Sequence, residues 1–379
     1  MWDLVVVGAG PAGATAALAA MRTDPAARVL LLDRADFPRD KACGDGIAVH
    51  VADQLRQLGA AQVLAGAPPI TGLRLTTPGG VVAAGQPRRA NYVVPRTDFD
   101  ARLVAAAVDA GAQLHKTKVR TVTSDGPSVV LDEGLTARVV VAADGANSTV
   151  RRLLGLPANQ GRHLGIAVRG YAPGDPAAVE QRIDMVADGW PAYAWDFPTG
   201  IGLRNVGIGV VRDQLRGGKT ALHERLMQRY PETDAATLRA HHLPFSSSRP
   251  QPAHGRVLLA GDAASLINPL SGEGIYYAVV SGRLAGEAAI RRPDAAGAVY
   301  RRGLHATLGR HFFHTATLAR VIRHRPLVEA AVRLAARRRP AYDELVEIAL
   351  GQGLVRAGTL ARVVASYRPA SREEPACAR

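Results

Sequence analysis

A glycine-rich turn near the start of the chain is the first pattern that could do chemistry. Residues 8–13 read GAGPAG, and they stand between the apolar run Asp3–Val7 and the alanine-rich segment Ala14–Met21. A strand that passes through such a turn into a helix points free backbone N–H groups and the positive end of the helix dipole at a phosphate. Asp33 ends the next apolar run, 20 positions after Gly13, where an acid can accept a hydrogen bond from a ribose hydroxyl. The pattern predicts a βαβ unit that binds a dinucleotide.

Two further pairs of an acid and a glycine extend this site. Asp144-Gly145 closes one apolar strand, and Gly261-Asp262 follows another and leads into Gly272-Glu273-Gly274. Asp262 is placed to accept hydrogen bonds from ribityl hydroxyls, and glycines let backbone N–H groups approach a flavin. One G-x-G-x-x-G turn is weak evidence, but the three segments in this order predict an FAD site. Taken alone, Asp262 could instead be the N-cap of a helix.

The three glycines of the turn have separate expected roles. Gly8 permits the tight turn, Gly10 lets the backbone approach a pyrophosphate, and Gly13 lets the helix pack closely on the strand. Arg96 precedes a helical segment, and we expect it near the pyrophosphate or the flavin; the alternative is a surface arginine that caps the helix. No spacing typical of metal ligands occurs, so we expect no metal site.

The order of strand and helix patterns predicts an α/β fold with a Rossmann-like FAD-binding domain, an inserted mixed-sheet substrate domain and a helical C-terminal region. The FAD-binding domain is expected at 1–158 and 250–290, the substrate-binding sheet domain at 72–95 and 159–249, and the C-terminal helices at 291–379. Residues 73–83 resemble a hairpin, and helix breaks are expected at Pro293, Pro326 and Pro340.

The bulk numbers indicate an ordinary globular protein. The chain has 379 residues, of which 47% are hydrophobic and 21% charged, so it can bury a large core without disulfides or metals. Cys43 and Cys377 are far apart, and we expect no structural disulfide between them. There is no signal-peptide pattern and no run of about 18 uninterrupted apolar residues, so we expect a cytoplasmic protein without a membrane-spanning helix.

The net charge of +14 is concentrated near the end of the chain. Residues 291–379 contain 17 arginines and no lysine, against seven acidic side chains. Such a region suits anionic lipid headgroups or an acidic protein partner, although it could simply be a solvated helical surface. No nucleic-acid motif occurs and only 5% of residues are aromatic, so we expect no nucleic-acid partner. Nothing in the sequence calls for an oligomer, and we expect a monomer.

The three flavin motifs resemble the FAD-dependent superfamily that includes the aromatic hydroxylases. Three segments narrow the resemblance to the geranylgeranyl reductase family, including relatives that saturate an isoprene unit of menaquinone. These segments are Phe37–Gly46 (FPRDKACGDG), the run from Gly261 through Asn268–Tyr276, and Tyr193–Pro198 (YAWDFP) followed by Asn205–Gly207. The resemblance covers roughly residues 1–290. It implies FAD, reduction of isolated C=C bonds in prenyl or polyene chains, and substrates that are often membrane-associated.

The resemblance also implies a cysteine beside the flavin, which corresponds to Cys43. The resulting set of cofactor-binding residues is Gly8, Gly10, Pro11, Ala12, Gly13, Asp33, Arg34, Cys43, Gly44, Arg96, Asp144, Gly145, Gly261, Asp262, Gly272, Gly274 and Ile275. Asp45 is expected either to cap the next helix or to orient the cofactor. His50 is expected to be structural.

Reduction of an unactivated alkene needs a hydride at one carbon and a proton at the other. If protonation leads, a cationic centre develops, and aromatic walls stabilise it. Tyr193, Trp195 and Phe197 alternate along one strand and therefore share a face, which is also what an ordinary core strand shows. The catalytic candidates are Cys43, Tyr193 and Trp195, with Cys43 as proton donor or as a packing residue. The expected substrate-binding residues are Tyr193, Trp195, Phe197 and Pro269.

An FAD-dependent ene reductase acting on a hydrophobic prenyl or polyene substrate is the favoured function. The alternative is an FAD monooxygenase that hydroxylates a hydrophobic aromatic or a specialised metabolite, which uses the same flavin motifs. A flavin halogenase and a non-catalytic flavoprotein scaffold are weaker alternatives. Only one dinucleotide fingerprint is present, so the electron donor is expected to be NAD(P)H bound transiently or a ferredoxin-like carrier.

Overall fold

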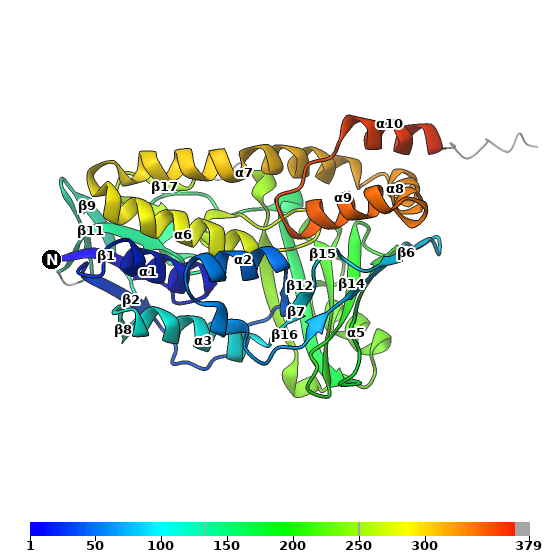
Figure 1. Ribbon diagram of the computed structural model, residues 1–379, viewed down its shortest axis with the longest axis horizontal. Coiled ribbons are helices and arrows are strands. Elements are labelled where there is room, and N and C mark those ends of the chain that lie inside the picture. Colours follow the sequence, from blue (N-terminus) through cyan, green and yellow to red (C-terminus); the bar gives the residue numbers. More distant parts are fainter. Residues whose placement is uncertain (133, 249–250, 368–379) are drawn as a thin grey trace, which may run out of the picture.

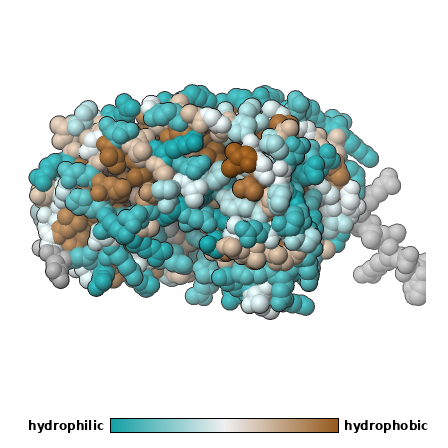
Figure 2. Space-filling view, turned by 90° about the horizontal axis from the view of Figure 1, so that it is seen from below, coloured by the Kyte–Doolittle hydropathy of each residue, from teal (hydrophilic) through white to brown (hydrophobic). Residues whose placement is uncertain are grey.

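The computed structural model describes residues 1–132, 134–248 and 251–367. Two sheets lie at opposite ends of an elongated molecule, and long helices run beside them (Figure 1). The face shown in Figure 2 is mostly hydrophilic, with apolar patches. The main hydrophobic core lies between the first sheet and the helices that pack on it. Residues 368–379, which include Cys377, lie outside the described residues.

The first sheet is built on the strands that the sequence shows as continuous apolar runs. Strand β1 (Trp2–Val7) is parallel to β2 (Val29–Asp33) on one side and to β11 (Leu135–Ala142) on the other. The full order is β17-β18-β11-β1-β2-β8. The outer strands are β8 (Gln113–Lys116), β9 (Val122–Asp125), β10 (Ser128–Leu131), β17 (Ala253–His254) and β18 (Val257–Leu259). Strands buried on both faces are typical of a parallel sheet covered by helices.

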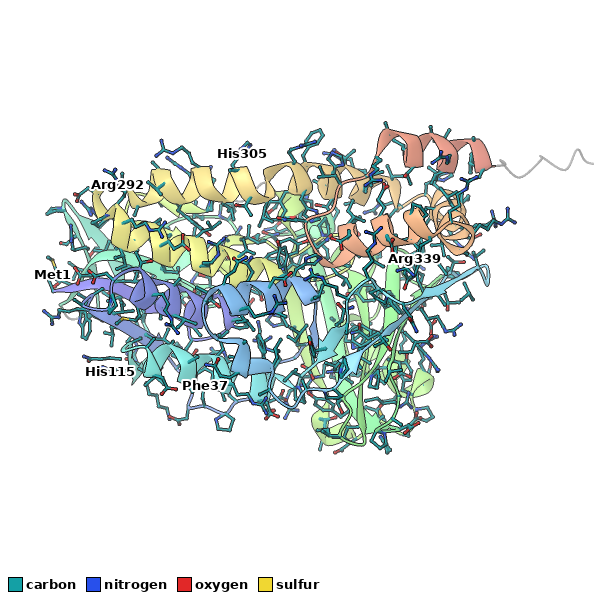
Figure 3. All side chains as sticks on the ribbon, in the orientation of Figure 1. Met1, Phe37, His115, Arg292, His305 and Arg339 are labelled. Atoms are coloured by element: carbon teal, nitrogen blue, oxygen red, sulfur yellow. The ribbon has the colours of Figure 1, made fainter. Side chains whose placement is uncertain are left out.

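Helix α1 (Pro11–Thr23) packs against both α3 (Arg96–Asp109) and α6 (Ile275–Arg291). The contact between α1 and α6 is very close, because a Cβ at Gly282 or Gly286 would lie 2.1 Å from the carbonyl oxygen of Ala12 or Ala16. Helix α7 (Ala296–Val321) packs on α6 and runs from the end near Arg292, past His305, toward the second sheet (Figure 3). The shorter helices of this part are α2 (Val49–Gln57) and α4 (Thr149–Leu153).

The second sheet has the order β16-β12-β15-β14-β13-β5-β6. Only β13 and β5 pair in parallel; the other neighbours are antiparallel. Its strands are β5 (Gly72–Thr76), β6 (Val82–Gly85), β12 (Leu164–Pro173), β13 (Glu180–Val186), β14 (Ala192–Pro198), β15 (Leu203–Val211) and β16 (Arg239–Pro244). A small third sheet joins β3 (Gly46–Ile47), β4 (Pro69–Ile70) and β7 (Asn91–Val93). The expected hairpin at residues 73–83 is confirmed as the β5–β6 pair.

Helices cover the second sheet. Helix α5 (Gly218–Arg229) buries Leu222 and Leu226 among side chains of β12, β14 and β15. The C-terminal helices α8 (Arg325–Arg337) and α9 (Arg339–Leu350) pack against β5 and β6, and α10 (Ala357–Ser366) packs on α8. Pro326 and Pro340 each lie in the first turn of a helix, where the missing N–H group is not needed.

Short 3₁₀ helices connect these elements at Ala61–Leu64, Gly161–His163, Arg212–Gln214, Ala235–Thr237, Ser246–Ser248, Gly261–Ala264 and Pro293–Ala295. The predicted α/β class, with a Rossmann-type part, mixed sheets and C-terminal helices, is confirmed. None of the helices that the structure describes is long and apolar enough to cross a bilayer.

Candidate active site

A cavity of about 1040 Å³ lies where the first sheet, the second sheet and the C-terminal helices meet. Nearly all of the residues predicted for the site line it. From the cofactor set these are Gly8, Gly10, Pro11, Ala12, Asp33, Arg34, Cys43, Gly44, Arg96, Asp144, Gly145, Asp262, Gly272, Gly274 and Ile275. The substrate set, Tyr193, Trp195, Phe197 and Pro269, lines the same cavity. Gly13 and Gly261 do not line it.

Two glycines of the turn are needed for close packing, and a third has open space beside it. Gly8 has φ +97°, and a Cβ at Gly13 would lie 1.7 Å from the carbonyl oxygen of Gly8, so both residues must be glycine for the turn to close. A Cβ at Gly261 would lie 3.0 Å from that of Ala12, so Gly261 also serves packing. At Gly10 the nearest atom to such a Cβ is a side-chain nitrogen of Arg39, at 3.5 Å. The turn therefore leaves room above Gly10 for a phosphate at the start of α1.

Asp33 lies at the end of β2, and its carboxylate already has two backbone partners. The N–H of Ala9 donates to Oδ2 at 2.8 Å, and the N–H of Ala35 donates to Oδ1 at 2.9 Å. Arg39 approaches Oδ2 at 3.9 Å. These bonds fix Asp33 between the glycine turn and the cavity. Each carboxylate oxygen has a further lone pair that can accept from a ribose hydroxyl.

Arg96 is a buried residue at the start of α3 rather than a surface cap, so the alternative interpretation of this arginine is wrong. Its side chain is 3% exposed and makes a bidentate ion pair with Asp100, which is fully buried. Arg39 approaches the same carboxylate at 3.3 Å. Sequence reasoning missed Asp100 and Arg39, although the spacing of Arg96 and Asp100 by four positions on a helix was a usable signal.

Asp262 is held by two side chains that sequence reasoning did not identify. Lys41 Nζ lies 3.1 Å and His241 Nε2 lies 3.2 Å from Oδ2 of Asp262. Burial alone would raise the pKa of this carboxyl, but Lys41 and His241 outweigh burial and hold the pKa well below its usual range. Helix α6 begins at Ile275, with Gly274 as its N-cap, so Asp262 is not the cap of that helix. It lies instead in the short 3₁₀ helix beside the cavity.

Asp144 combines a place on the cavity wall with a structural role. Its oxygens accept hydrogen bonds from the Ser148 hydroxyl and from the backbone N–H groups of Thr149 and Val150 at the start of α4. Burial raises the pKa of this carboxyl although these donors oppose the change. Gly145, with φ +82° and open space beside it, is the part of the pair that leaves room for a ligand.

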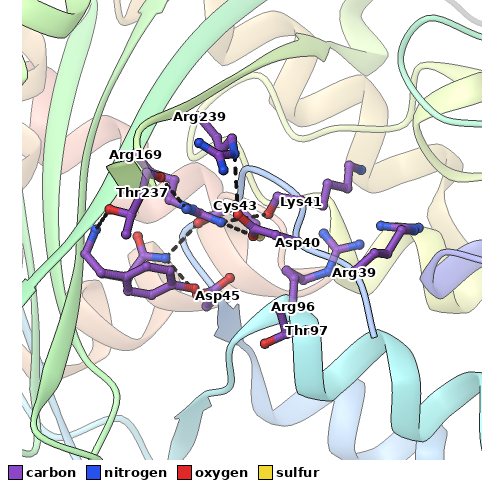
Figure 4. Close-up of polar contacts among 12 residues, drawn as sticks. Arg39, Asp40, Lys41, Cys43, Asp45, Arg96, Thr97, Arg169, Thr237 and Arg239 are labelled. Carbon is purple, nitrogen blue, oxygen red and sulfur yellow. Dashed lines mark hydrogen bonds and ion pairs between the residues drawn. The ribbon is translucent and has the colours of Figure 1, made fainter. Parts of the chain in front are cut away.

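Cys43 lies on the loop between β2 and β3, among the residues drawn in Figure 4. It lines the cavity. The Arg96 guanidinium and the Asp45 backbone N–H both act to lower the pKa of its thiol. Burial raises the pKa of the Cys43 thiol, and this effect exceeds the opposite effects of Arg96 and Lys41. The sulfur therefore holds its proton at neutral pH, while the Arg96 charge and the Asp45 N–H favour a thiolate if the proton leaves.

Asp45 does not cap α2, whose N-cap is Ala48, so the capping expectation was wrong. It is fully buried with φ +58°, and Oδ2 accepts hydrogen bonds from the Tyr171 hydroxyl and, at 2.7 Å, from Asn205 Nδ2. Burial raises its pKa to about 6, despite the bond from Tyr171. His50 forms an ion pair with Glu347 of α9 at 3.1 Å, which agrees with a structural role.

The alternating strand β14 presents its aromatic side chains to the cavity. Tyr193 and Trp195 lie with ring centroids 5.9 Å apart. A Cβ on Gly44 would lie 3.3 Å from Trp195 Nε1 and 3.4 Å from the Phe197 ring, so this wall lies directly against the loop of Cys43. Ala194, between the aromatic residues, packs instead in the core under α5.

The cavity continues beyond the aromatic strand into an apolar extension formed by the C-terminal helices. Sequence reasoning did not predict this, because the family resemblance ended near residue 290. The extension is lined by side chains of α7 to α10, including Leu318, Val328, Val332, Leu345, Leu360 and Val364. The C-terminal helices therefore form part of the site as well as a basic surface.

Glu273 also lines the cavity, next to the start of α6. Its Oε1 accepts a hydrogen bond from the Tyr276 N–H at 2.8 Å. Burial raises the pKa of Glu273 to about 7, although the backbone donors Tyr276 and Ile275 oppose it. Burial, with smaller contributions from Glu273 and Cys43, raises the pKa of the Tyr193 hydroxyl as well. At the aromatic end of the cavity, Glu273 and Tyr193 therefore keep their protons to a higher pH than they would in water.

Comparison with known proteins defines the class. An FAD binding domain family model matches residues 1–169. A menaquinone reductase of Mycolicibacterium smegmatis is 37% identical over 315 residues, which cover 75% of this chain and 75% of the relative. A digeranylgeranylglycerophospholipid reductase of Methanopyrus kandleri is 32% identical over 324 residues, or 76% of this chain and 80% of the relative.

A solved structure shares the fold over nearly the full length. The geranylgeranyl bacteriochlorophyll reductase-like protein of Thermoplasma acidophilum has a TM-score of 0.79 at 21% identity, and the match covers 97% of this chain and 96% of that protein. The matched FAD domain and the glycine cradle define an FAD-dependent oxidoreductase. The chain belongs to the geranylgeranyl reductase family, as its motifs indicated. The two sequence relatives are named as reductases, which favours this activity over the hydroxylase and halogenase alternatives.

Proposed function

We propose that this protein uses FAD to saturate isolated C=C bonds in an isoprenoid or polyene chain. One arrangement carries the proposal: Cys43 and the aromatic strand β14 meet at Gly44, between the glycine cradle and an apolar extension. The relatives named as reductases of menaquinone and of a digeranylgeranyl lipid support the same class of substrate. The menaquinone relative makes a prenylated quinone the first substrate to test.

The chain's residues fit the cofactor. The N-terminus of α1, with the open position at Gly10, would hold the pyrophosphate, and Asp33 would hold a ribose. Asp262, kept ionised by Lys41 and His241, would accept from ribityl hydroxyls. When bound and reduced, FAD supplies the hydride for the reaction.

Cys43 would give the proton. Its thiol is protonated at neutral pH and faces the cavity. As the hydride adds to one alkene carbon, the S–H bond breaks and the proton adds to the other carbon, which leaves a thiolate. The Arg96 guanidinium and the Asp45 N–H would stabilise that thiolate until solvent returns the proton. The faces of Tyr193 and Trp195 would stabilise positive charge that develops on carbon.

The apolar extension would hold the rest of the prenyl chain. Helix α10 supplies part of its wall through Leu360 and Val364. These two side chains are also 49% and 57% exposed, so apolar surface continues from the cavity to the outside of α10. Arg356 precedes these residues in the sequence, and Arg362 lies between them. Such a surface fits peripheral contact between a cytoplasmic monomer and a membrane that holds the substrate. An acidic ferredoxin-like carrier could use the same charges; NAD(P)H is the other proposed donor.

An anaerobic experiment tests the proposed function. The bound flavin is reduced with dithionite, a menaquinone or geranylgeranyl compound is added, and reoxidation is followed by absorbance and mass spectrometry. We expect reoxidation without oxygen and a product heavier by two hydrogen atoms. Reoxidation only by oxygen, with an aromatic substrate gaining one oxygen atom, would support the hydroxylase alternative instead.

A further inference from the structure

Asn205 makes a set of hydrogen bonds that no site motif predicted. It lies on β15, fully buried, opposite Tyr171 of β12 and Phe197 of β14. Its Nδ2 donates to the Cys43 carbonyl oxygen at 2.8 Å and to Asp45 Oδ2 at 2.7 Å. Its Oδ1 accepts from Trp195 Nε1 at 2.8 Å. One side chain therefore joins the Cys43 loop to the aromatic wall.

The chemistry of these partners fixes the orientation of the amide. The Cys43 carbonyl and the Asp45 carboxylate can only accept, and the indole N–H of Trp195 can only donate. The amide of Asn205 presents its Nδ2 donor to the carbonyl and the carboxylate, and its Oδ1 acceptor to the indole N–H. An aspartate at this position would set an anion against another carboxylate and a carbonyl oxygen.

The surrounding glycines leave Trp195 and the loop in direct contact. A Cβ on Gly207, the cross-strand neighbour of Trp195, would lie 2.0 Å from the indole ring, so the ring lies flat on the strand there. Gly44 lets the loop approach the same indole. Asp45 has φ +58°, an uncommon conformation for a residue other than glycine, and Asn205 and Tyr171 hold its side chain.

We propose that Asn205 is a positioning residue that sets the place of the Cys43 sulfur relative to the Trp195 ring. Asn205 does not itself line the cavity; it acts through Cys43 and Trp195. The expected effect on turnover rests on the proposed function, but the expected effect on the reactivity of the Cys43 thiol does not. The effect must therefore be measured in both ways.

The first readout is the reactivity of the Cys43 thiol in the FAD-bound protein without substrate. A small alkylating reagent is added, and modification is followed on the peptide that carries Cys43, with the Cys377 peptide as internal reference. We expect Asn205→Ala to increase the Cys43 rate about tenfold, because the loop loses two of its bonds. The matched control is Asn159→Ala, since Asn159 is also buried and its Nδ2 also donates to two oxygens, the carbonyls of His163 and Phe245, neither of which belongs to the Cys43 loop.

The second readout is turnover with rescue. We expect Asn205→Ala and Asn205→Asp to retain FAD and to lower kcat by about 100-fold, with a much smaller change in KM. The double variant Asp45→Asn with Asn205→Asp restores a donor and acceptor pair between the two positions, and we expect it to recover part of the kcat lost in Asn205→Asp. Asparagine also tolerates the positive φ at position 45.

Three results would overturn the proposal. The first is Cys43 reactivity that stays within twofold of the wild type in Asn205→Ala. The second is an effect on reactivity as large in Asn159→Ala, which would make it a general loss of stability. The third is a double variant no better than Asn205→Asp alone. If no alkene substrate is found at all, the proposed function fails, but the reactivity experiment still decides the role of Asn205.

Discussion

Arg96 and Asp100 form a bidentate ion pair inside the protein, with Nε–Oδ1 and Nη2–Oδ2 distances of 2.6 and 2.7 Å. The charge of Arg96 also favours the thiolate form of Cys43. The pair thus connects helix α3 to the loop that carries the proposed proton donor. Its geometry satisfies both buried charges, and removal of one partner leaves the other without adequate compensation.

Replacement of Arg96 by alanine should destabilise the protein by about 3–5 kcal/mol, because Asp100 would remain buried with only the more distant Arg39 as a cation. Urea unfolding of the apoprotein measures this. The control is Arg291→Ala, whose ion pair with Glu287 has the same spacing of four but an exposed arginine, and which should change stability by less than about 1 kcal/mol. Equal effects of the two substitutions would contradict the account of the buried pair.

Gly207→Ala should impair the alkene step while Gly209→Ala should not. Both glycines lie on β15, but a Cβ at Gly207 would lie 2.0 Å from the Trp195 ring, and one at Gly209 would lie 3.4 Å from the Tyr193 ring, an ordinary contact. Displacement of the indole should lower turnover about tenfold or more with FAD still bound. Rates of flavin reoxidation by substrate test this, and two variants with the same rate would argue against a precise position for Trp195.

Glu273 should make stability depend on pH. Burial raises the pKa of Glu273 to about 7 from its ordinary value of 4.5, so the folded protein binds this proton more tightly than the unfolded chain. The stabilisation is complete below about pH 4.5 and is lost as the pH rises to about 7. Glu273→Gln keeps an acceptor for the Tyr276 N–H and removes the titration.

The wild type should therefore lose about 1–3 kcal/mol relative to Glu273→Gln between pH 4.5 and pH 8, measured by unfolding of the two apoproteins in parallel. A stability difference that does not change with pH would show that Glu273 titrates normally.

Leu345→Trp should discriminate between long and short substrates. Leu345 lines the apolar extension, and an indole there would fill space that a long prenyl tail needs. We expect KM to rise about tenfold for a long-chain substrate and to remain nearly unchanged for a short prenyl compound. Leu153→Trp, on the exposed face of α4, is the control. The same KM change for both substrates would place the tail elsewhere.

The cofactor part of the site could be predicted from the sequence because residues close together in the chain determine its geometry. The turn at Gly8 and Gly13 needs glycine for steric reasons that a few residues determine. The alternation of Tyr193, Trp195 and Phe197 likewise predicts a shared face from strand geometry alone. Family motifs then added Cys43, which no local pattern marks as reactive.

What the sequence did not reveal depends on contacts between distant segments. Lys41 and His241 meet Asp262 only because the second sheet packs against the loop after β2. Asn205 joins Cys43 to Trp195 across the same junction. The C-terminal helices carry no recognisable motif, and only their packing on the second sheet shows that they line the cavity.

Whether Cys43 gives a proton to the alkene is measured by single-turnover reoxidation of dithionite-reduced protein with a prenylated quinone. Cys43→Ala and Cys43→Ser are compared with the wild type under anaerobic conditions at equal FAD content. We expect Cys43→Ala to slow the alkene step by about 100-fold or more while FAD binding is retained. An unchanged rate in both variants, with the same saturated product, would contradict it.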